Sequence, residues 1–341
     1  MIPEGDTIQE KTMDYYDNVY GLVTISEPVL LDLLASATMR RLQGVLQHGV
    51  SALIGITEPV TRFDHSVGAM LLVRRLNGSL AEQIAALLHD ASHTAFSHVI
   101  DYVFDGHDSQ SYHDEKKEEF LAQTDVPGIL ARHGYDWQDF LHEEDFPLLE
   151  QPSPRLCADR LDYFLRDARG LGLATAVQIQ TALDHLVVGN GRIAANTLEA
   201  AQWLGYTFIA ADDASWANFR EVGLYELTAQ AIRRGLAIGA ISETDIWGID
   251  QPMWAKLHAH PDAELQTTLR LVHPATGFAW DEKTPTFQVS TKLRAIDPDV
   301  VLDDGTLAPL STLDAEFARH RATYLRSKQG KWPMRVIPPT A

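Results

Sequence analysis

Histidines crowd into one short stretch of this chain. The sequence has 341 residues and 14 histidines, and half of these histidines fall within residues 48–113. Neutral imidazole is the commonest metal ligand among side chains and a frequent general acid or base, so the clustering indicates a place where chemistry is done. The histidines of this stretch are His48, His65, His89, His93, His98, His107 and His113.

The pair His89-Asp90 ends a predicted buried helix. Ser79 and Glu82 have the spacing of a capping box, which opens a helix that runs toward Asp90. One side of this helix is leucine and isoleucine and the other is alanine, so neither side carries the charges of a solvated face. Burying a histidine and an aspartate is costly unless they are paired or bind a metal. A single buried histidine is more simply explained by a bond to a backbone carbonyl, but the pair together with His93 favours a metal site.

Two further segments carry polar residues at suggestive spacings. Asp159, Tyr163 and Arg166 share one face of a predicted helix, a pattern that an exposed amphipathic helix would also show. Arg62 stands three positions before His65, just ahead of another predicted helix. Neither pattern is decisive alone.

Together these segments resemble the signature blocks of the HD-domain phosphohydrolase superfamily. The blocks are Thr61-Arg-Phe-Asp-His65, Leu87-Leu-His89-Asp90-Ala-Ser-His93-Thr-Ala-Phe-Ser-His98 and Ala158-Asp159-Arg-Leu-Asp-Tyr-Phe-Leu-Arg-Asp167. The resemblance extends over roughly residues 12–250. It is strongest to the branch of the deoxynucleoside triphosphate triphosphohydrolases and their shorter bacterial relatives, which the run Arg40–Gln47 also resembles.

The resemblance implies one divalent metal ion, with Mn, Fe, Zn or Mg as candidates. Such an ion can lower the pKa of its water toward about 7 and polarise a phosphoryl group. The implied ligands are His65, His89, Asp90 and Asp159.

The resemblance also implies catalytic and substrate-binding side chains. The implied residues for phosphate contact or acid–base catalysis are His93, His98 and His113, with Asp101 as a partner that orients His98. The implied phosphate contacts are Arg62 and Arg160, and the implied sugar contacts are Tyr163 and Asp167. Gln47 stands 18 residues before His65, where the triphosphohydrolases have a glutamine that contacts the sugar 3′-hydroxyl. The alternative for Gln47 is that it merely ends a helix in water.

We therefore expect a metal-dependent phosphohydrolase that cleaves a nucleotide or a similar small phosphate ester. Three departures from the triphosphohydrolases leave the number of phosphates removed open. Ala91-Ser92 replaces the usual aliphatic residue and glycine, the segment Phe219–Tyr225 lacks the following His-Lys, and the chain is shorter. Two alternatives are a di-iron oxygenase of the HD type, with a second metal on His93 and His113, and a non-catalytic nucleotide-binding HD protein.

The elements that must position these residues are mostly helices. Helical patterns cover residues 28–46, 66–76, 79–90, 153–170, 216–238 and 313–327. Asn190-Gly191 supplies the turn of a predicted β-hairpin at residues 185–193, and short alternating runs follow residue 270. We expect a mainly α protein: an HD-domain helical bundle with a small β-hairpin over residues 1–270, and a small C-terminal α+β extension over residues 271–341.

Composition limits the partners and the compartment. The net charge is −19, from 28 basic and 47 acidic residues, which argues against broad nucleic-acid binding. The single cysteine, Cys157, excludes an internal disulfide and a CxxC zinc site. No apolar run of about 20 residues and no signal-peptide pattern are present, so we expect a cytoplasmic protein that does not enter a membrane. The sequence is compatible with a homo-oligomer.

Overall fold

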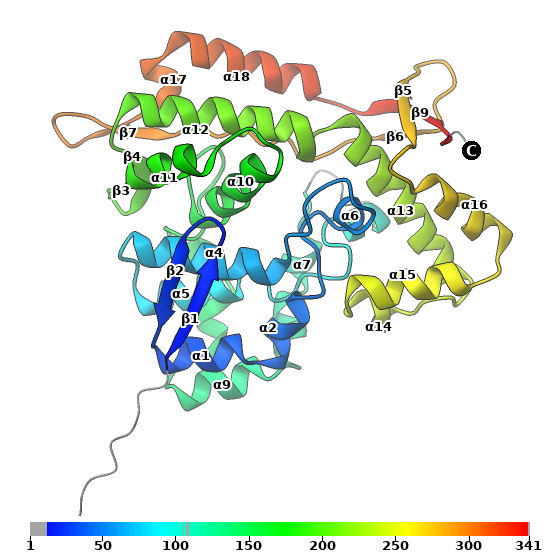
Figure 1. The fold of residues 1–341 in the computed structure, drawn as a ribbon, viewed down its shortest axis with the longest axis horizontal. Coiled ribbons are helices and arrows are strands. Elements are labelled where there is room, and N and C mark those ends of the chain that lie inside the picture. Colours follow the sequence, from blue (N-terminus) through cyan, green and yellow to red (C-terminus); the bar gives the residue numbers. More distant parts are fainter. Residues whose placement is uncertain (1–11, 105, 107–108, 340–341) are drawn as a thin grey trace, which may run out of the picture.

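The computed structural model describes residues 12–104, 106 and 109–339 (Figure 1). Helices hold 52% of the chain and strands 12%, so the expected mainly α fold is correct only in part. Across the described residues the strands form three small sheets.

The first half of the chain builds a helical body entered through a short hairpin. The hairpin pairs Met13 with Ile25 and Asp17 with Gly21. The elements of this half of the chain are β1 (Met13–Asp17), β2 (Gly21–Ile25), α1 (Pro28–Leu34), α2 (Ala37–Leu42), α3 (Val50–Leu53), α4 (Arg62–Arg75), α5 (Leu80–Leu88), α6 (Val99–Val103), α7 (Tyr112–Glu115), α8 (Lys117–Leu121), α9 (Val126–Arg132) and α10 (Ala158–Gly170).

The second half of the chain returns over this body. Its elements are α11 (Ala176–Asp184), β3 (Leu186–Gly189), β4 (Arg192–Ala195), α12 (Leu198–Ala211), a π-turn (Asp212–Trp216), α13 (Phe219–Ala237), α14 (Glu243–Ile246), α15 (Asp250–Ala259), α16 (Ala263–Leu271), β5 (Gly277–Trp280), β6 (Phe287–Val289), β7 (Asp299–Val301), β8 (Leu307–Pro309), α17 (Leu310–Leu313), α18 (Ala315–Lys328) and β9 (Trp332–Ile337). Figure 1 shows α12 and α18 side by side above the body, and α13 to α16 beside it.

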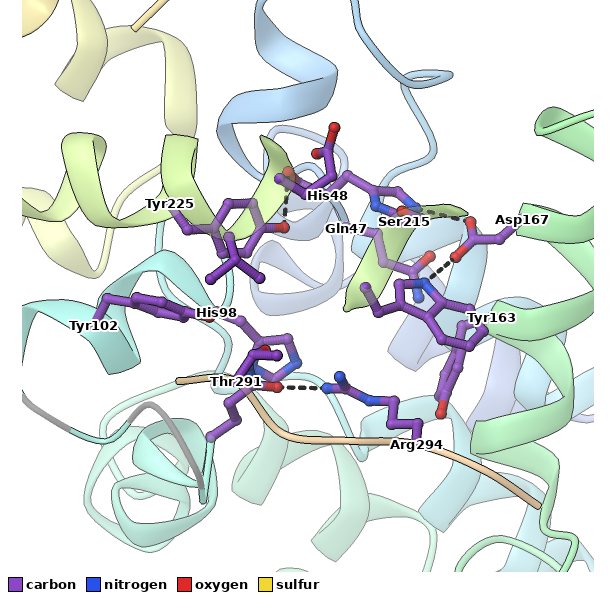
Figure 2. Close-up of a pocket in the computed structure, with 14 residues that line it drawn as sticks. Gln47, His48, His98, Tyr102, Tyr163, Asp167, Ser215, Tyr225, Thr291 and Arg294 are labelled. Atoms are coloured by element: carbon purple, nitrogen blue, oxygen red, sulfur yellow. Dashed lines mark hydrogen bonds and ion pairs between the residues drawn. The ribbon is translucent and has the colours of Figure 1, made fainter. Parts of the chain in front are cut away.

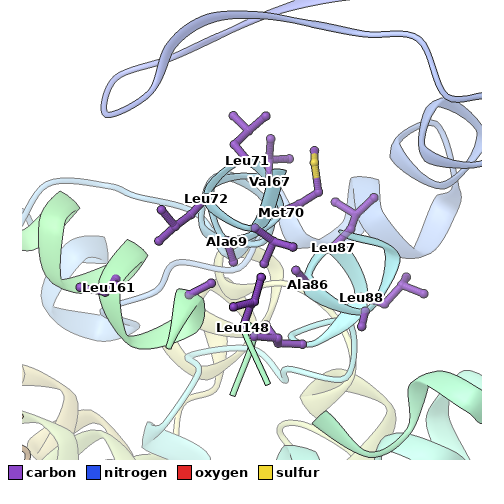
Figure 3. Close-up of a cluster of buried hydrophobic side chains, with 14 of the residues drawn as sticks. Val67, Ala69, Met70, Leu71, Leu72, Ala86, Leu87, Leu88, Leu148 and Leu161 are labelled. Atoms are coloured by element: carbon purple, nitrogen blue, oxygen red, sulfur yellow. The ribbon is translucent and has the colours of Figure 1, made fainter. Parts of the chain in front are cut away.

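Helices α4, α5 and α10 form the centre of the body. Their facing side chains, among them Val67, Met70, Leu87 and Leu161, are fully buried (Figure 3). Fully burying each of the larger ones contributes about 1.5–3 kcal/mol. Gly68 faces α10, where a Cβ atom would lie 2.0 Å from polar side-chain atoms of that helix. The glycine therefore permits the close approach that brings residues of α4 and α10 together.

The C-terminal residues are tied into the body. Strand β7 runs parallel to β4, with Val300 opposite Ala195, in a sheet ordered β3-β4-β7-β8. The irregular segment at residues 290–298 joins β6 to β7 and crosses the face of the body. Residues 271–341 thus share a sheet and, as described below, a cleft with residues 1–270.

Several predicted helices begin or end elsewhere. The helix expected at 28–46 is two helices, because Ser36 leaves the helical conformation and caps α2 through the backbone N–H of Met39. The helix expected from residue 153 begins only at Ala158, after an irregular segment. The hairpin at 185–193 is confirmed, with Asn190 and Gly191 at positive φ. The hairpin β1–β2 was not predicted. No helix within the described ranges is long and apolar enough to cross a membrane.

Candidate metal centre and substrate cleft

Four predicted ligands converge where α4, α5 and α10 meet. The Nε2 atom of His65 lies 3.2 Å from Nε2 of His89 and 3.0 Å from Oδ1 of Asp159. Asp90 lies 3.6 Å from both histidines. Two ligand atoms on the same metal, with bonds of about 2.1 Å, are separated by about 3.0–3.4 Å. The donor atoms of His65, His89 and Asp159 form one group within 4.8 Å and therefore fit a single divalent ion. Asp90 lies slightly farther away and also forms a group with His93 and His113.

Hydrogen bonds on the far side of each imidazole fix its orientation. Nδ1 of His65 lies 2.7 Å from Oδ2 of Asp162, and Nδ1 of His89 donates to the carbonyl of Ala86 at 2.7 Å. A histidine that donates from Nδ1 presents the lone pair of Nε2, as metal-binding histidines do. The two lone pairs then point at a common position, which fits a cation between them.

The charge around this position also favours a cation. Although burial lowers the pKa of His89, the carboxylates of Asp90 and Asp159 raise it to about 10. Burial opposes ionisation of Asp90, but Arg62 and the histidines hold its pKa well below the usual range. The carboxylates thus favour a positive charge at the imidazole of His89, and a divalent cation bound at its Nε2 would take the place of the proton. Carboxylate and imidazole donors together suit a first-row divalent metal.

A buried relay connects the centre to the N-terminal hairpin. Asp162 accepts from Nε of Arg166 at 2.8 Å, and Nη2 of Arg166 donates to Asp17 at 2.7 Å. Asp17 ends β1, and its other oxygen accepts from the backbone of Val19 and Tyr20. Sequence reasoning missed Asp162, although it stands three residues after Asp159 and therefore on the same face of α10.

Arg62 forms a buried ion pair with Asp90. Its Nη1 donates to Oδ2 of Asp90 at 2.7 Å, and its Nε donates to the hydroxyl of Ser97 at 3.0 Å. The side chain is almost fully buried. The structure thus places this predicted phosphate contact against a metal ligand.

Three more histidines form a group next to Asp90. Nε2 of His93 lies 3.2 Å from Oδ1 of Asp90, and its ring stacks on His113 at 3.7 Å. His98 meets the ring of His93 edge-on at 5.0 Å. Burial, together with Arg62, lowers the pKa of His93 to about 3 and that of His98 well below its usual value. His107 lies outside the described residues.

His98 is oriented by a carboxylate and by a strained backbone. Its Nδ1 lies 3.0 Å from Oδ2 of Asp101, whose other oxygen accepts from the backbone of Tyr112. The two residues before it, Phe96 and Ser97, have φ of 63° and 50°, a left-handed conformation that costs non-glycine residues about 1–3 kcal/mol each. Asp250 accepts from the N–H of Phe96 at 2.7 Å and helps to hold this conformation.

The metal centre opens into a polar cleft of about 550 Å³. Acidic residues of the α7 region and of residues 143–150 form much of its lining, together with Asp90 and Asp159. Lys292 and Arg294, from the segment at 290–298, bring positive charge to the same cleft. Arg160 also lines it, with its guanidinium bonded to Glu150 and to the carbonyls of residues 151 and 155. Lys292 and Arg294 were missed because no periodic element of the sequence carries them.

A narrow inner chamber, of about 70 Å³, adjoins this cleft and is shown in Figure 2. Tyr163, Gln110 and Arg294 line both spaces, and a side-chain hydrogen bond joins Arg294 to Gln110. Aromatic rings form much of the wall. The other lining residues are Gln47, His48, His98, Tyr102, Asp167, Ser215, Trp216, Glu221, Val222, Tyr225 and Thr291.

The three predicted sugar contacts, Gln47, Tyr163 and Asp167, all line this chamber. Gln47 is buried, and within the described part of the chain its Oε1 has no hydrogen-bond partner. Both oxygens of Asp167 are engaged, Oδ1 with Nε2 of His48 at 2.8 Å and Oδ2 with the indole N–H of Trp216 at 2.7 Å. Gln47 therefore does not end a helix in water; it follows α2 after a short turn and faces a cavity.

Known proteins are similar to this chain over the same residues. Residues 62–167, which hold all four candidate ligands, match the family model of the HD domain. The chain is 38% identical over 320 residues to the metal-dependent phosphohydrolase cns2 of Cordyceps militaris, and the alignment covers 92% of each chain. It is 37% identical over 319 residues to the uncharacterized protein YdhJ of Bacillus subtilis, over 93% of this chain and 98% of YdhJ.

Solved structures share the fold over nearly the whole chain. A phosphohydrolase from Bacteroides thetaiotaomicron superposes with a TM-score of 0.65 at 20% identity, covering 96% of this chain and 100% of the other. A hypothetical protein from Aquifex aeolicus gives a TM-score of 0.67 at 17% identity, covering 96% of both chains. The C-terminal segment therefore belongs to a shared architecture.

Proposed function

Because this chain belongs to the HD-domain superfamily of metal-dependent phosphohydrolases, we propose that it hydrolyses the phosphate ester or anhydride of a nucleotide or a similar small phosphorylated compound. Membership of the triphosphohydrolase branch stays a prediction. The observation that carries the proposal is a cleft lined by three of the four candidate ligands, His89, Asp90 and Asp159. The same cleft also receives Lys292 and Arg294 and joins an aromatic chamber.

The charge of each side chain suits it to a different role in the reaction. A divalent metal held by the four ligands would polarise a phosphoryl oxygen and lower the pKa of a water. Lys292 and Arg294 lie where they would bind phosphate oxygens, since an anion in this acidic cleft needs local positive charge. His98, held by Asp101, lies at the border of the chamber and would protonate the leaving oxygen. An arriving phosphate dianion opposes the low pKa of His98 and helps it to carry that proton.

Gln47 supports a nucleotide as the substrate. An amide can both donate to and accept from one hydroxyl group. We propose that Gln47 contacts the sugar 3′-hydroxyl and that Asp167 and Tyr163 line the sugar site. A site that hydrogen-bonds a substrate hydroxyl can reject the analogue lacking it by about 10⁴-fold.

A phosphate-release screen tests the function. The metal-loaded protein is assayed with ribo- and deoxynucleoside mono-, di- and triphosphates and with 3′-deoxy analogues. We expect turnover of at least one nucleotide, with kcat/KM falling sharply for its 3′-deoxy analogue in wild type but much less in Gln47→Ala. Nucleotide binding without phosphate release would instead favour a non-catalytic binding protein.

One observation keeps a di-iron oxygenase as the second candidate. Asp90, His93 and His113 form a second group whose donor atoms lie within 4.8 Å of one another. Arg62, 2.7 Å from Asp90, places a fixed positive charge beside that group and so weakens a second cation. The measurement that separates the two candidates is metal stoichiometry with oxygen consumption. One metal per chain and no oxygen uptake support the hydrolase.

A further inference from the structure

One carboxylate in the inner chamber is left without a matching donor. Glu221, on α13, lines the chamber and is 6% exposed. Its Oε2 atom is buried and, across the described ranges, accepts no hydrogen bond. Its Oε1 atom lies 3.6 Å from the guanidinium of the exposed Arg220, which is too long for a hydrogen bond. A buried acceptor in this condition is costly, and it indicates a partner that arrives from outside the chain.

Glu221 lies beside Tyr225, at the end of the chamber that is remote from His98. The two residues are four positions apart on α13 and so share one face of the helix. In agreement, the charge of Glu221 contributes to the raised pKa of Tyr225 and of His48. Figure 2 shows Tyr225 and His48 at one end of the chamber, with His98 and Arg294 at the other. The chamber is therefore negative at its remote end and positive toward the cleft.

The charges and the free acceptors determine how a phosphate ester would enter. The phosphate belongs in the cleft, because Lys292 and Arg294 lie there and Glu221 would repel it from the remote end. Part of the alcohol group then enters the chamber between the aromatic rings, since a volume of about 70 Å³ holds only a portion of a nucleoside. Gln47 and Glu221 both line the chamber, and among the described residues neither Oε1 of Gln47 nor Oε2 of Glu221 has a hydrogen-bond partner, so both are free to accept from an occupant.

We propose that Glu221 selects substrates whose alcohol part presents hydrogen-bond donors to the remote end of the chamber. This rests on the proposed function and specifies the substrate class for that same site. A nucleotide has two possible sources of such donors, an amino group of the base and a hydroxyl group of the sugar. A carboxylate accepts from either and repels a carbonyl oxygen placed at the same point.

The test compares wild type with Glu221→Gln, which keeps the shape and removes the charge. The substrates are nucleoside monophosphates in matched pairs: adenosine against inosine and cytidine against uridine for the base, and ribo- against 2′-deoxy forms for the sugar. p-Nitrophenyl phosphate, whose alcohol part has no donor, reports on the metal centre. Glu226→Gln is the control, because Glu226 is a buried residue of the same helix that pairs with Arg233 outside the chamber.

We expect wild type to favour the member that bears the exocyclic amino group or the 2′-hydroxyl in at least one pair by about 10- to 100-fold in kcat/KM, since hydrogen bonds to charged groups are strong. Glu221→Gln should reduce that preference to within about threefold and leave p-nitrophenyl phosphate turnover equal or higher. The pair that shows the effect identifies the donor as amino group or hydroxyl. Glu226→Gln should leave the preference unchanged.

Three results would overturn the assignment and are distinguishable. An equal loss on every substrate in Glu221→Gln, p-nitrophenyl phosphate included, would make Glu221 purely structural. Nucleotide turnover in wild type without discrimination in any pair would also reject it. Turnover of p-nitrophenyl phosphate with no turnover of any nucleotide would instead reject the nucleotide function itself, and the role of Glu221 with it.

Discussion

The carboxylate of Asp90 lies close to two imidazoles and a guanidinium. It is 3.6 Å from Nε2 of both His65 and His89, and Arg62 donates to it at 2.7 Å. The guanidinium keeps the carboxylate ionised and in place, so that it can bind a cation without a proton to displace. Removing Asp90 takes away a proposed ligand and also leaves Arg62 buried without its partner.

We predict that Asp90→Ala abolishes both bound metal and hydrolysis. Elemental analysis measures the metal, and far-UV circular dichroism reports whether the variant folds. Asp90→Asn keeps the volume and should give the same loss if the variant with alanine is unstable. Asp139→Ala, which changes an exposed aspartate, is the control. Full metal occupancy in both Asp90 variants would contradict the ligand assignment.

We predict a different result for His98, which lies near the candidate metal centre but is not one of the proposed ligands. His98→Ala should retain metal and lose turnover by about 10²–10⁴-fold, the usual contribution of a general acid. Asp101→Asn should lose less, because the imidazole remains but is less well oriented. His258→Ala alters an exposed histidine and should leave turnover intact. Unchanged turnover in His98→Ala would transfer the acid role to His93 or His113.

Site residues that lie within short motifs could be predicted from the sequence, whereas residues that come from distant parts of the chain were missed. The pair His89-Asp90 was identifiable because buried charge next to an alanine face is costly. Asp162 could have been found from its helical spacing. Arg294 and Glu221 could not, because their relation to the centre depends on how residues distant in the chain fold back over it.

At the scale of elements, the contact between α4 and α10 determines the geometry of the centre. His65 comes from α4 and Asp159 from α10, so their 3.0 Å separation requires the two helices to lie close. Gly68 permits this approach, since a Cβ atom there would overlap both Arg166 and Asp162. Helix propensity alone disfavours glycine in this position by about 1 kcal/mol, so its presence reflects packing.

We predict that Gly68→Ala destabilises the protein by about 1–3 kcal/mol through overpacking and weakens metal binding. Chemical denaturation and metal titration measure the two effects. Gly128→Ala is the matched control, because a Cβ atom in this helical position of α9 meets nothing within 4 Å. It should be neutral or stabilising by up to about 1 kcal/mol. Equal stability of the two variants would contradict the role of close packing at Gly68.

Most helices and hairpins could be predicted from the sequence where their cap or turn depends on a few adjacent residues. Asn190-Gly191 predicted its hairpin, and Ser79 caps α5 as expected. Glu82 completes only half of the capping box, because its carboxylate accepts from the backbone of Leu148 instead. The helix expected at 28–46 failed at Ser36, where a cap inside a continuous apolar pattern starts a second helix.

At the scale of the whole molecule, charge distribution conflicts with the proposed substrate. A net charge of −19 repels anions, and the cleft itself is largely acidic. The segment at 290–298 offsets this locally by bringing Lys292 and Arg294 to the cleft. The C-terminal part of the chain thus contributes to substrate capture as well as to packing.

We predict that Arg294→Ala raises KM by about 10- to 100-fold, the loss expected for a charge-assisted hydrogen bond to phosphate. Metal content should not change, because Arg294 is not a ligand. Arg319→Ala, which changes an exposed arginine of α18, is the control. Steady-state kinetics at two salt concentrations measure the effect, and raised salt should weaken the wild type more than the variant. An unchanged KM would remove Arg294 from the phosphate site.

The late position of Arg294 in the chain sets an order of assembly during synthesis. All four proposed ligands have been translated by residue 159, whereas Arg294 follows more than a hundred residues later. At about 5–20 residues per second, this interval lasts on the order of ten seconds. A nascent chain therefore contains all four proposed ligands well before it contains Arg294. During synthesis, the metal can bind before the site is able to retain a phosphorylated substrate.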